Sequence, residues 1–311
     1  MSKASKSNGR IAILGVFVAD AVYRAKRMPE IGETLLGNSF ALGPGGKGSN
    51  QSVAAARAGA EVTFVTRLGN DPFADMALKL YEEAGVNPLI EQLDDSYTGS
   101  AFIFVDDDSG DNAIIIAPGA ATTITPEFVD SAKTAITAAD VFITQLEQPI
   151  DAATRALSIA KNAGVTTILN TAPAESIADS VFQLCDYVTP NEIEAQTYTG
   201  VEVKSLDDAR RAADVFLKKG VGTAIITLGE SGVLIHSAQI SEHVPAFKVG
   251  KVVDTTGAGD AFNAGFATAL SSGKQPVESA RFGCAVAGLS VTRHGTSDSM
   301  PMRSEILEIL S

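Results

Sequence analysis

The chain has 311 residues, 45% of them hydrophobic, which is enough for one large α/β domain with an accessory element. Its 24 Lys and Arg against 37 Asp and Glu give a net charge of −13, and this charge argues against a nucleic-acid partner. No apolar run reaches the roughly 20 residues of a membrane span and the N-terminus has no signal-peptide core, so we expect a cytoplasmic protein without a membrane partner.

Short apolar runs alternate with helical runs along most of the chain. Strands are predicted at residues 11–15, 62–66, 141–144, 166–169, 187–189 and 224–227. Helices are predicted at residues 50–58, 72–83, 152–162 and 206–219. The alternation predicts an α/β fold with a doubly wound, largely parallel sheet flanked by helices.

Two stretches break this alternation. Residues 22–42 contain Pro and Gly and show little helical periodicity. Residues 99–117 are typical of a β-hairpin whose turn, at residues 106–111, is acidic. The turn lacks the spacing and the helices of a calcium-binding EF-hand, so a solvated turn is the better interpretation.

A glycine-rich segment, Gly-Pro-Gly-Gly-Lys-Gly-Ser-Asn at residues 43–50, precedes the helix at 50–58. It fits G-x-G-x-x-G by accident, since nothing around residues 68–71 supplies a ribose-binding acid; a nicotinamide-dependent oxidoreductase rests on this match alone. The P-loop pattern fails as well, because Gly48 follows Lys47. The remaining interpretation is a flexible loop that brings Lys47 and Asn50 to a polar ligand.

The most informative segment is Asp-Thr-Thr-Gly-Ala-Gly-Asp at residues 254–260, between a valine-rich strand predicted at 251–253 and a helix. Three small residues leave bare backbone N–H groups that attract an anion at the helix start: Gly257, Ala258 and Gly259. Asp260 would repel a phosphate there, but it makes sense as a base that takes a proton from an attacking hydroxyl. Alternatively, Asp260 is a first-turn acid that stabilises its own helix.

Together the two glycine clusters resemble the signatures of the ribokinase-like carbohydrate kinases, the PfkB family. The first signature runs over residues 45–69 and the second over 254–265, in the family's order and spacing. Between them, residues 189–194 resemble the family's N-x-x-E motif and residues 227–232 its nucleotide loop. The resemblance extends over residues 11–299.

Within the family, residues 45–50 and 292–295 look most like those of the ribokinases. The resemblance therefore implies an ATP-dependent kinase that transfers the γ-phosphoryl group to a sugar hydroxyl, with D-ribose to D-ribose 5-phosphate as the first expectation and Asp260 as the general base. The amides of Ala258, Gly259 and Asp260 would form the anion hole. A catalytically silent sugar- or nucleotide-sensing protein on the same fold is the alternative, although Asp260 argues against it.

The resemblance also implies the domain organisation. An α/β nucleotide-binding and catalytic domain would comprise residues 1–17, 49–96 and 118–311, and a small β-sheet lid residues 18–48 and 97–117. In this family the lids of two subunits pack together, so a homodimer through the lids is implied.

The implied sugar site consists of Asp20, Gly46, Lys47, Asn50, Glu147 and Asp260. The chain departs from the family at Val18, where ribokinase-like sequences often have Asn two residues before the sugar-binding Asp20. Val18 cannot hydrogen-bond, which favours a sugar that lacks one hydroxyl or turns it differently. Ribose, 2-deoxyribose and another furanose or nucleoside all remain open, since a neighbour or a water could restore the contact.

The resemblance further implies ATP, Mg²⁺ and a potassium ion. Asn191 and Glu194 would arrange Mg²⁺ and its waters, or form a helix N-cap, or both. The nucleotide would lie against Thr227, Gly229, Gly232 and Gly259, with Cys284 either beside it or a thiol that packs between helices. The potassium site, mostly of backbone carbonyls, would use Asp254, Thr256, Ser290, Arg293, Gly295 and Ser299.

Overall fold

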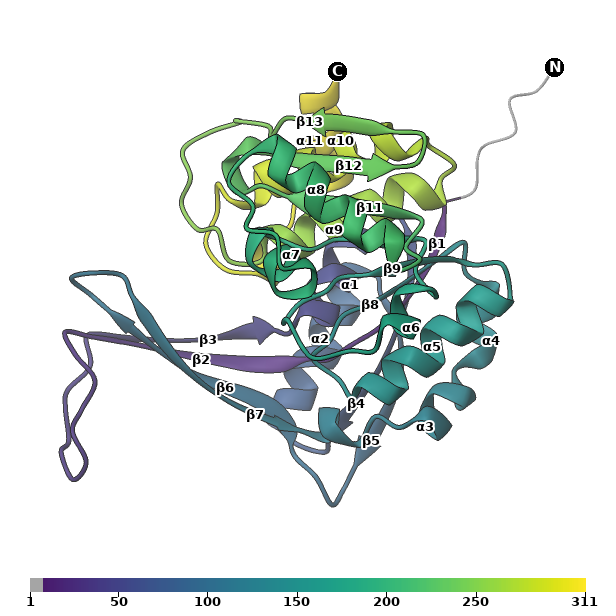
Figure 1. The fold of residues 1–311 in the computed structure, drawn as a ribbon. Coiled ribbons are helices and arrows are strands. Elements are labelled where there is room, and N and C mark those ends of the chain that lie inside the picture. The colour runs from purple at the N-terminus through teal and green to yellow at the C-terminus, as the bar shows by residue number, and fades with distance from the viewer. Residues whose placement is uncertain (1–7) are drawn as a thin grey trace.

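A nine-stranded sheet with helices on both faces forms the body of the protein in the computed structural model, which describes residues 8–311 (Figure 1). Its strand order is β13-β12-β11-β10-β9-β8-β1-β4-β5. The pairs from β5 to β11 are parallel, and β12 and β13 are antiparallel additions at one edge. The strands are β1 (Arg10–Leu14), β4 (Glu61–Gly69), β5 (Asn87–Leu93), β8 (Val141–Thr144), β9 (Thr166–Leu169), β10 (Tyr187–Val188), β11 (Thr223–Thr227), β12 (Val233–Ser237) and β13 (Ser241–Val244).

Alternate residues of each central strand enter two separate hydrophobic cores. Ile11 and Ile13 of β1 face one core, while Ala12 and Leu14 face the other. The first core is covered by α1 (Lys47–Arg57), α2 (Pro72–Ala84), α9 (Ala258–Ser271), α10 (Pro276–Ser290) and α11 (Arg303–Leu310). The second is covered by α3 (Pro126–Ser131), α4 (Lys133–Ala138), α5 (Ile150–Asn162), α6 (Asp179–Phe182), α7 (Glu192–Thr199) and α8 (Leu206–Lys218). Burial on both sheet faces explains why these strands are continuous apolar runs in the sequence.

A second sheet of four strands projects from the body (Figure 1). Its order is β3-β2-β6-β7, from β2 (Val18–Ala25), β3 (Ser39–Gly45), β6 (Thr98–Asp106) and β7 (Asn112–Gly119). The predicted hairpin with its acidic turn is confirmed as β6 and β7, where Asp106 Oδ1 accepts hydrogen bonds from the N–H groups of Asp108 and Ser109. Large apolar side chains of this sheet are exposed, among them Phe40, Leu42, Ile114, Ile115 and Ile116.

The predicted α/β class and doubly wound sheet are confirmed, and each predicted strand within the sheet and each predicted helix is present with shifts of a few residues at the ends. The strand predicted at 251–253 is wrong. Val252 and Val253 are 58% and 42% exposed, and the segment is held only by the N–H groups of Val253 and Asp254, which donate to the carbonyl of Val291. Without a neighbouring strand or burial, β-branched residues do not form a strand.

Two kinds of helix start bear on the site. Asp71 caps α2, Asn191 caps α7 and Ser205 caps α8, each accepting from first-turn N–H groups. In contrast, α1 and α9 begin at glycines with positive φ, Gly46 and Gly257, and have no side-chain cap. In α1 the N–H groups of Lys47 and Ser49 already donate to Glu147 Oε2 and to the Val16 carbonyl, so the start of α9 has more N–H groups left for a ligand.

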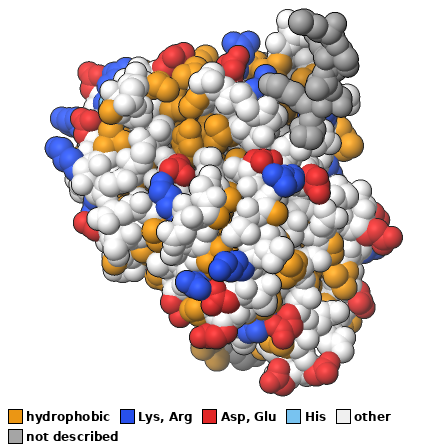
Figure 2. All heavy atoms as spheres, turned by 90° about the vertical axis from the view of Figure 1, so that its right-hand side faces the viewer, with side chains coloured by type: hydrophobic (Ala, Val, Ile, Leu, Met, Phe, Trp, Pro, Cys, Tyr) orange, Lys and Arg blue, Asp and Glu red, His pale blue; other side chains and the backbone are white. Residues whose placement is uncertain are grey.

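On the face shown in Figure 2, acidic and basic side chains are interspersed. Elsewhere in the structure, ion pairs such as Arg155–Asp130 and Lys161–Asp186 join neighbouring elements. The net negative charge is thus not gathered into one patch on this face.

No helix within residues 8–311 combines the length and the apolar character needed to cross a membrane.

Candidate active site

Several of the predicted site residues meet where the carboxyl ends of the parallel strands β1, β8, β9 and β10 face the starts of α1, α7 and α9. Gly15 follows β1, Gln145 follows β8 and Asn170 follows β9. Ligands of open α/β sheets bind at this edge, because loops from several strands converge there. Lys47, Glu147 and Asp260, separated by up to 213 positions in the numbering, become neighbours there.

Asp260 lies in the first turn of α9 and is only 6% exposed. Asn50 Nδ2 donates to its Oδ2 at 3.0 Å, and Gln51 Nε2 donates to its Oδ1 at 2.9 Å. Burial raises the pKa of the Asp260 carboxyl, and the Lys47 charge and the two amides oppose this rise. The carboxylate is therefore fixed in direction by two donors.

Space in front of the α9 start is open. A Cβ added to Gly259 would meet no atom within 4 Å. The N–H of Ala258 already donates to the carbonyl of Thr255 at 3.2 Å, so an anion would compete with this bond. The amides of Gly259 and Asp260 remain as the more available pair in this turn.

Lys47 and Glu147 lie near Asp260 and interact with its charge. The backbone N–H of Lys47 donates to Glu147 Oε2 at 2.8 Å. Burial raises the pKa of the Glu147 carboxyl to about 7, against the lowering effect of Lys47. Burial alone would lower the pKa of the Lys47 ammonium, but the charges of Asp260, Glu147 and Glu194 outweigh it and raise that pKa. Lys47 is therefore a cation at neutral pH, held among carboxylates.

Asp20 lies on β2, which enters the small sheet. Burial raises the pKa of its carboxyl to about 6. Its carboxyl group packs over Gly45, where an added Cβ would lie 2.2 Å from Asp20 Oδ2. Val18, 7% exposed, pairs with Gly45 in the same strand register that pairs Asp20 with Gly43. The extended backbone of β2 puts Val18 and Asp20 on one face, as predicted.

Asn191 and Glu194 form a complete capping box at the start of α7. Asn191 Oδ1 accepts from the Glu194 N–H at 2.8 Å, and Glu194 Oε2 accepts from the Asn191 N–H at 3.0 Å. The helix-cap interpretation is thus confirmed. Within residues 8–311 no group of three or more His, Cys, Asp or Glu side chains could hold a metal ion. The two residues fit Mg²⁺ only as partners of its bound waters, a manner of binding that Mg²⁺ favours.

The predicted nucleotide residues occupy different environments. Thr227 ends β11 and leads into the turn η2 (Gly229–Ser231). A Cβ on Gly232 would lie 2.2 Å from the Val244 carbonyl oxygen, so this glycine allows the backbone to pass close to β13. Cys284 is buried in the core, where burial raises the pKa of its thiol to about 12. It packs as a neutral thiol.

The two loops of the predicted potassium site are joined by one side chain. Asp254 Oδ1 accepts from the Thr256 N–H at 2.9 Å, and its Oδ2 accepts from the Gly295 N–H at 3.1 Å. The hydroxyls of Ser290 and Ser299 donate hydrogen bonds to the carbonyls of Ala287 and Thr296. Arg293 pairs with Glu305 and so offers only its carbonyl. The side chains named here are thus used within the loops, and a cation at this place would depend on backbone carbonyls.

Sequence patterns missed a second layer of polar residues. Gln51, Gln145 and Asn170 form buried amide contacts behind Asp260, and Ser297 Oγ donates to Asn50 Oδ1 at 2.9 Å. The available signal was a polar residue directly after a buried strand, at Gln145 and Asn170.

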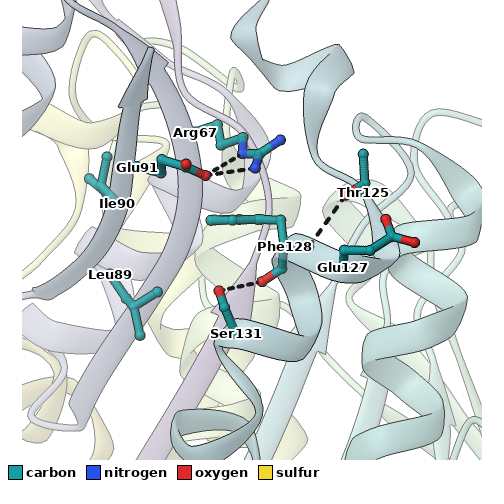
Figure 3. Close-up of a pocket in the computed structure, with 8 residues that line it drawn as sticks. All are labelled: Arg67, Leu89, Ile90, Glu91, Thr125, Glu127, Phe128 and Ser131. Carbon is teal, nitrogen blue, oxygen red and sulfur yellow. Dashed lines mark hydrogen bonds and ion pairs between the residues drawn. The ribbon is translucent and has the colours of Figure 1, made fainter.

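A cavity of about 390 Å³ lies elsewhere, beside the edge strand β5 and α3 (Figure 3). Arg67 lies over the ring of Phe128, 4.5 Å from its centroid, and pairs with Glu91. None of the predicted site residues lines this cavity.

Comparisons with known proteins point to one family. Residues 9–303 match the model of the pfkB family of carbohydrate kinases. The chain is similar to the ribokinase of Haemophilus influenzae, with 40% identity over 301 residues that cover 96% of this chain and 98% of the relative. It is also similar to the deoxyribokinase of Salmonella typhi, with 36% identity over 303 residues, 97% of this chain and 98% of the relative. The structure of Arabidopsis thaliana ribokinase complexed with ribose and ATP is similar with a TM-score of 0.94 and 30% identity, covering 97% of this chain and 99% of that one.

Proposed function

This chain belongs to the pfkB family of carbohydrate kinases, and on that premise we propose that it transfers the γ-phosphoryl group of ATP to a sugar hydroxyl, with D-ribose to D-ribose 5-phosphate as the reaction. The observation that supports this most is the surroundings of Asp260. A buried carboxylate, oriented by two amides, stands at a helix start that has no side-chain cap. One group accepts a proton while its neighbours hold developing negative charge.

In the proposed reaction, Asp260 accepts the proton of the attacking hydroxyl. The amides of Gly259 and Asp260, at the positive end of α9, stabilise charge on the transferred group. Lys47 neutralises charge beside them, and Asp20, Glu147 and Asn50 hold the sugar hydroxyls. A magnesium ion bound through waters at Asn191 and Glu194 would neutralise the phosphates.

2-Deoxyribose is the second candidate substrate, and Val18 favours it. The side chain lies on the same face of β2 as Asp20 and offers no hydrogen bond to a neighbouring hydroxyl. A curated relative named deoxyribokinase is 36% identical to this chain, close to the values for the ribokinases. Another furanose or a nucleoside remains an alternative.

We also propose that two copies pair through the exposed apolar face of the small sheet, which would act as the lid. The apolar side chains of β3 and β7 on this sheet support the pairing, because solvated apolar groups gain by burial. The potassium site and a cytoplasmic location stay predictions of the same kind.

A coupled assay of ADP release with a panel of sugars tests the function. We expect turnover with ribose, 2-deoxyribose or a close furanose, and the preferred sugar has the highest kcat/KM. Sugar binding without ADP release would instead support a silent sensor.

Asp260→Asn is the decisive variant. It should lower kcat by roughly 10²–10⁴-fold, because the base is lost. ATP binding, measured by calorimetry, should survive or tighten because a carboxylate near the phosphates is removed. A near-normal kcat in this variant would rule out Asp260 as the base.

A further inference from the structure

A chain of buried amides supports Asp260 from behind. Gln145 Nε2 donates to Gln51 Oε1 at 2.6 Å. Gln51 Nε2 in turn donates to Asp260 Oδ1 at 2.9 Å and to Asn170 Oδ1 at 3.1 Å. Gln51 and Gln145 are fully buried and Asn170 nearly so. The loops after β8 and β9 thus reach the base on α9 through a single residue of α1.

The contacts of Gln51 leave only one orientation for its amide. Its Oε1 faces a donor, the Gln145 amide, so its NH₂ group must face the other two partners. If the amide turned over, its carbonyl oxygen would face the Asp260 carboxylate, and both groups only accept hydrogen bonds. Gln145, Asn170 and Asp260 therefore all favour the orientation in which the NH₂ group of Gln51 meets Asp260.

Stability alone does not account for this arrangement. Gln145 Oε1 is buried and has no donor among residues 8–311. The side chain fits only because residue 15 is glycine, where an added Cβ would lie 2.4 Å from Gln145 Oε1. An apolar residue in place of Gln145 would only exchange one unpaired carbonyl for another, because Gln51 Oε1 would lose its donor, so the retained amide points to a role in orienting Gln51.

We propose that Gln51 is a positioning residue for the base, and that Gln145 sets the direction of its amide. This inference rests on the proposed kinase function. Asn50 and Gln51 each occupy one oxygen of Asp260, which leaves the remaining lone pairs for the sugar hydroxyl. Without Gln51 the carboxylate is free to rotate away from the line of proton transfer.

The same contact affects the proton affinity of the base. Gln51 and Asn50 stabilise the charged form of Asp260. Among charged groups, Lys47 favours that form, while the carboxylates Glu147 and Glu194 also interact with Asp260. Loss of the Gln51 donor should raise the pKa of Asp260, and the acidic limb of the kcat profile should move to higher pH.

The primary test is Gln51→Met, which keeps the length of the side chain and removes both donor and acceptor. We expect kcat to fall about 10- to 100-fold, with KM for ATP and for the sugar within about threefold of the parent. Gln51→Glu should shift the acidic limb further, because two adjacent carboxyls share a proton. The matched control is Ser52→Ala, the next residue of α1, whose buried hydroxyl bonds only the Gly48 carbonyl.

Gln145 provides a second test if the Gln51 variants fold poorly. Gln145→Glu presents an acceptor to Gln51 Oε1, so the amide should turn and kcat should fall with the same pH shift. Gln145→Met removes the donor without forcing that turn, so its effect should be smaller. Melting temperatures identify any variant that is merely unfolded.

Two results overturn the inference, and they differ. A folded Gln51→Met protein with parental kcat and pH profile, in an enzyme that phosphorylates sugars, removes the positioning role and leaves the proposed function intact. If the parent protein releases no ADP with any sugar, the proposed function fails and this inference fails with it.

Discussion

At the scale of single residues, the site contains carboxyl groups whose pKa values burial raises. Burial is the largest cause of the raised pKa values of Asp20, Glu147 and Asp260, and Lys47 opposes it at Glu147 and Asp260. Sequence motifs predicted these four residues, and the structure brings Lys47, Glu147 and Asp260 together. Gln51 could not be predicted, because its partners lie 94, 119 and 209 positions away and no local pattern encodes them.

These raised pKa values predict a pH dependence of sugar use. Below its pKa a carboxyl group is protonated. It then no longer accepts hydrogen bonds from sugar hydroxyls at both of its oxygens. With Glu147 near 7 and Asp20 near 6, kcat/KM for the sugar should fall as pH decreases through that window. Initial rates from about pH 8.5 to 5.5 test this, with the KM for ATP as the control. A flat sugar profile would contradict the assigned pKa values.

The identity of residue 18 predicts sugar preference. Val18→Asn supplies a hydrogen-bonding partner beside Asp20 and should raise kcat/KM for ribose relative to 2-deoxyribose. The shift should be about tenfold if one net hydrogen bond of about 1.4 kcal/mol is gained. Val18→Leu, which adds volume without a polar group, is the control. An unchanged ratio in Val18→Asn would show that residue 18 does not recognise that hydroxyl.

At the scale of elements, burial decided what the sequence could predict. Strands buried on both faces, such as β1 and β8, are continuous apolar runs and were predicted nearly to the residue. The edge strand β5 was missed, because it is half-exposed and contains Pro88. The exposed valines before Asp254 were predicted as a strand, since composition alone does not reveal the absence of a pairing partner.

The loop at Asp254 predicts dependence on a monovalent cation. Its carboxylate ties the α9 start to the loop at Gly295, so a cation held by both loops would fix the anion hole. Rates should be higher in potassium than in matched lithium or sodium salts. Asp254→Asn, which replaces one acceptor oxygen by a donor, should reduce the potassium effect. Equal rates of the parent in potassium and lithium would argue against the site.

At the scale of the whole molecule, the small sheet and the body both contribute residues to the proposed sugar site. The chain passes from β1 to β2 through residues 15–17 and returns from β3 to α1 at Gly46, so site residues lie at the junction. The sequence predicted both sheets. It did not predict which apolar side chains of the small sheet are exposed, since that depends on how its strands pair.

Exposed apolar residues on this sheet predict a dimer. The parent should have about twice the 32.2 kDa mass of one chain in light scattering. Ile115, 66% exposed on β7, is the best position for a charge, and Ile115→Glu should yield a monomer, because a buried unpaired carboxylate is costly. Leu307→Glu, at an exposed position on α11, is the control and should keep the parental mass. A monomeric parent would refute the pairing.

Two hydrogen bonds join the end of the chain to its beginning, and they affect what an incomplete chain can do. Ser297 Oγ donates to Asn50 Oδ1 at 2.9 Å, and Thr296 Oγ1 donates to the Pro44 carbonyl at 2.7 Å. They span 247 and 252 positions of a chain that leaves the ribosome from its N-terminus. A chain that ends before Thr296 contains Asp260 but lacks Ser297, the donor that holds the Asn50 oxygen and leaves its NH₂ group for the base. Chains interrupted before Thr296 are therefore expected to remain inactive, so that translation errors which shorten the protein produce no unregulated hydrolysis of nucleotide.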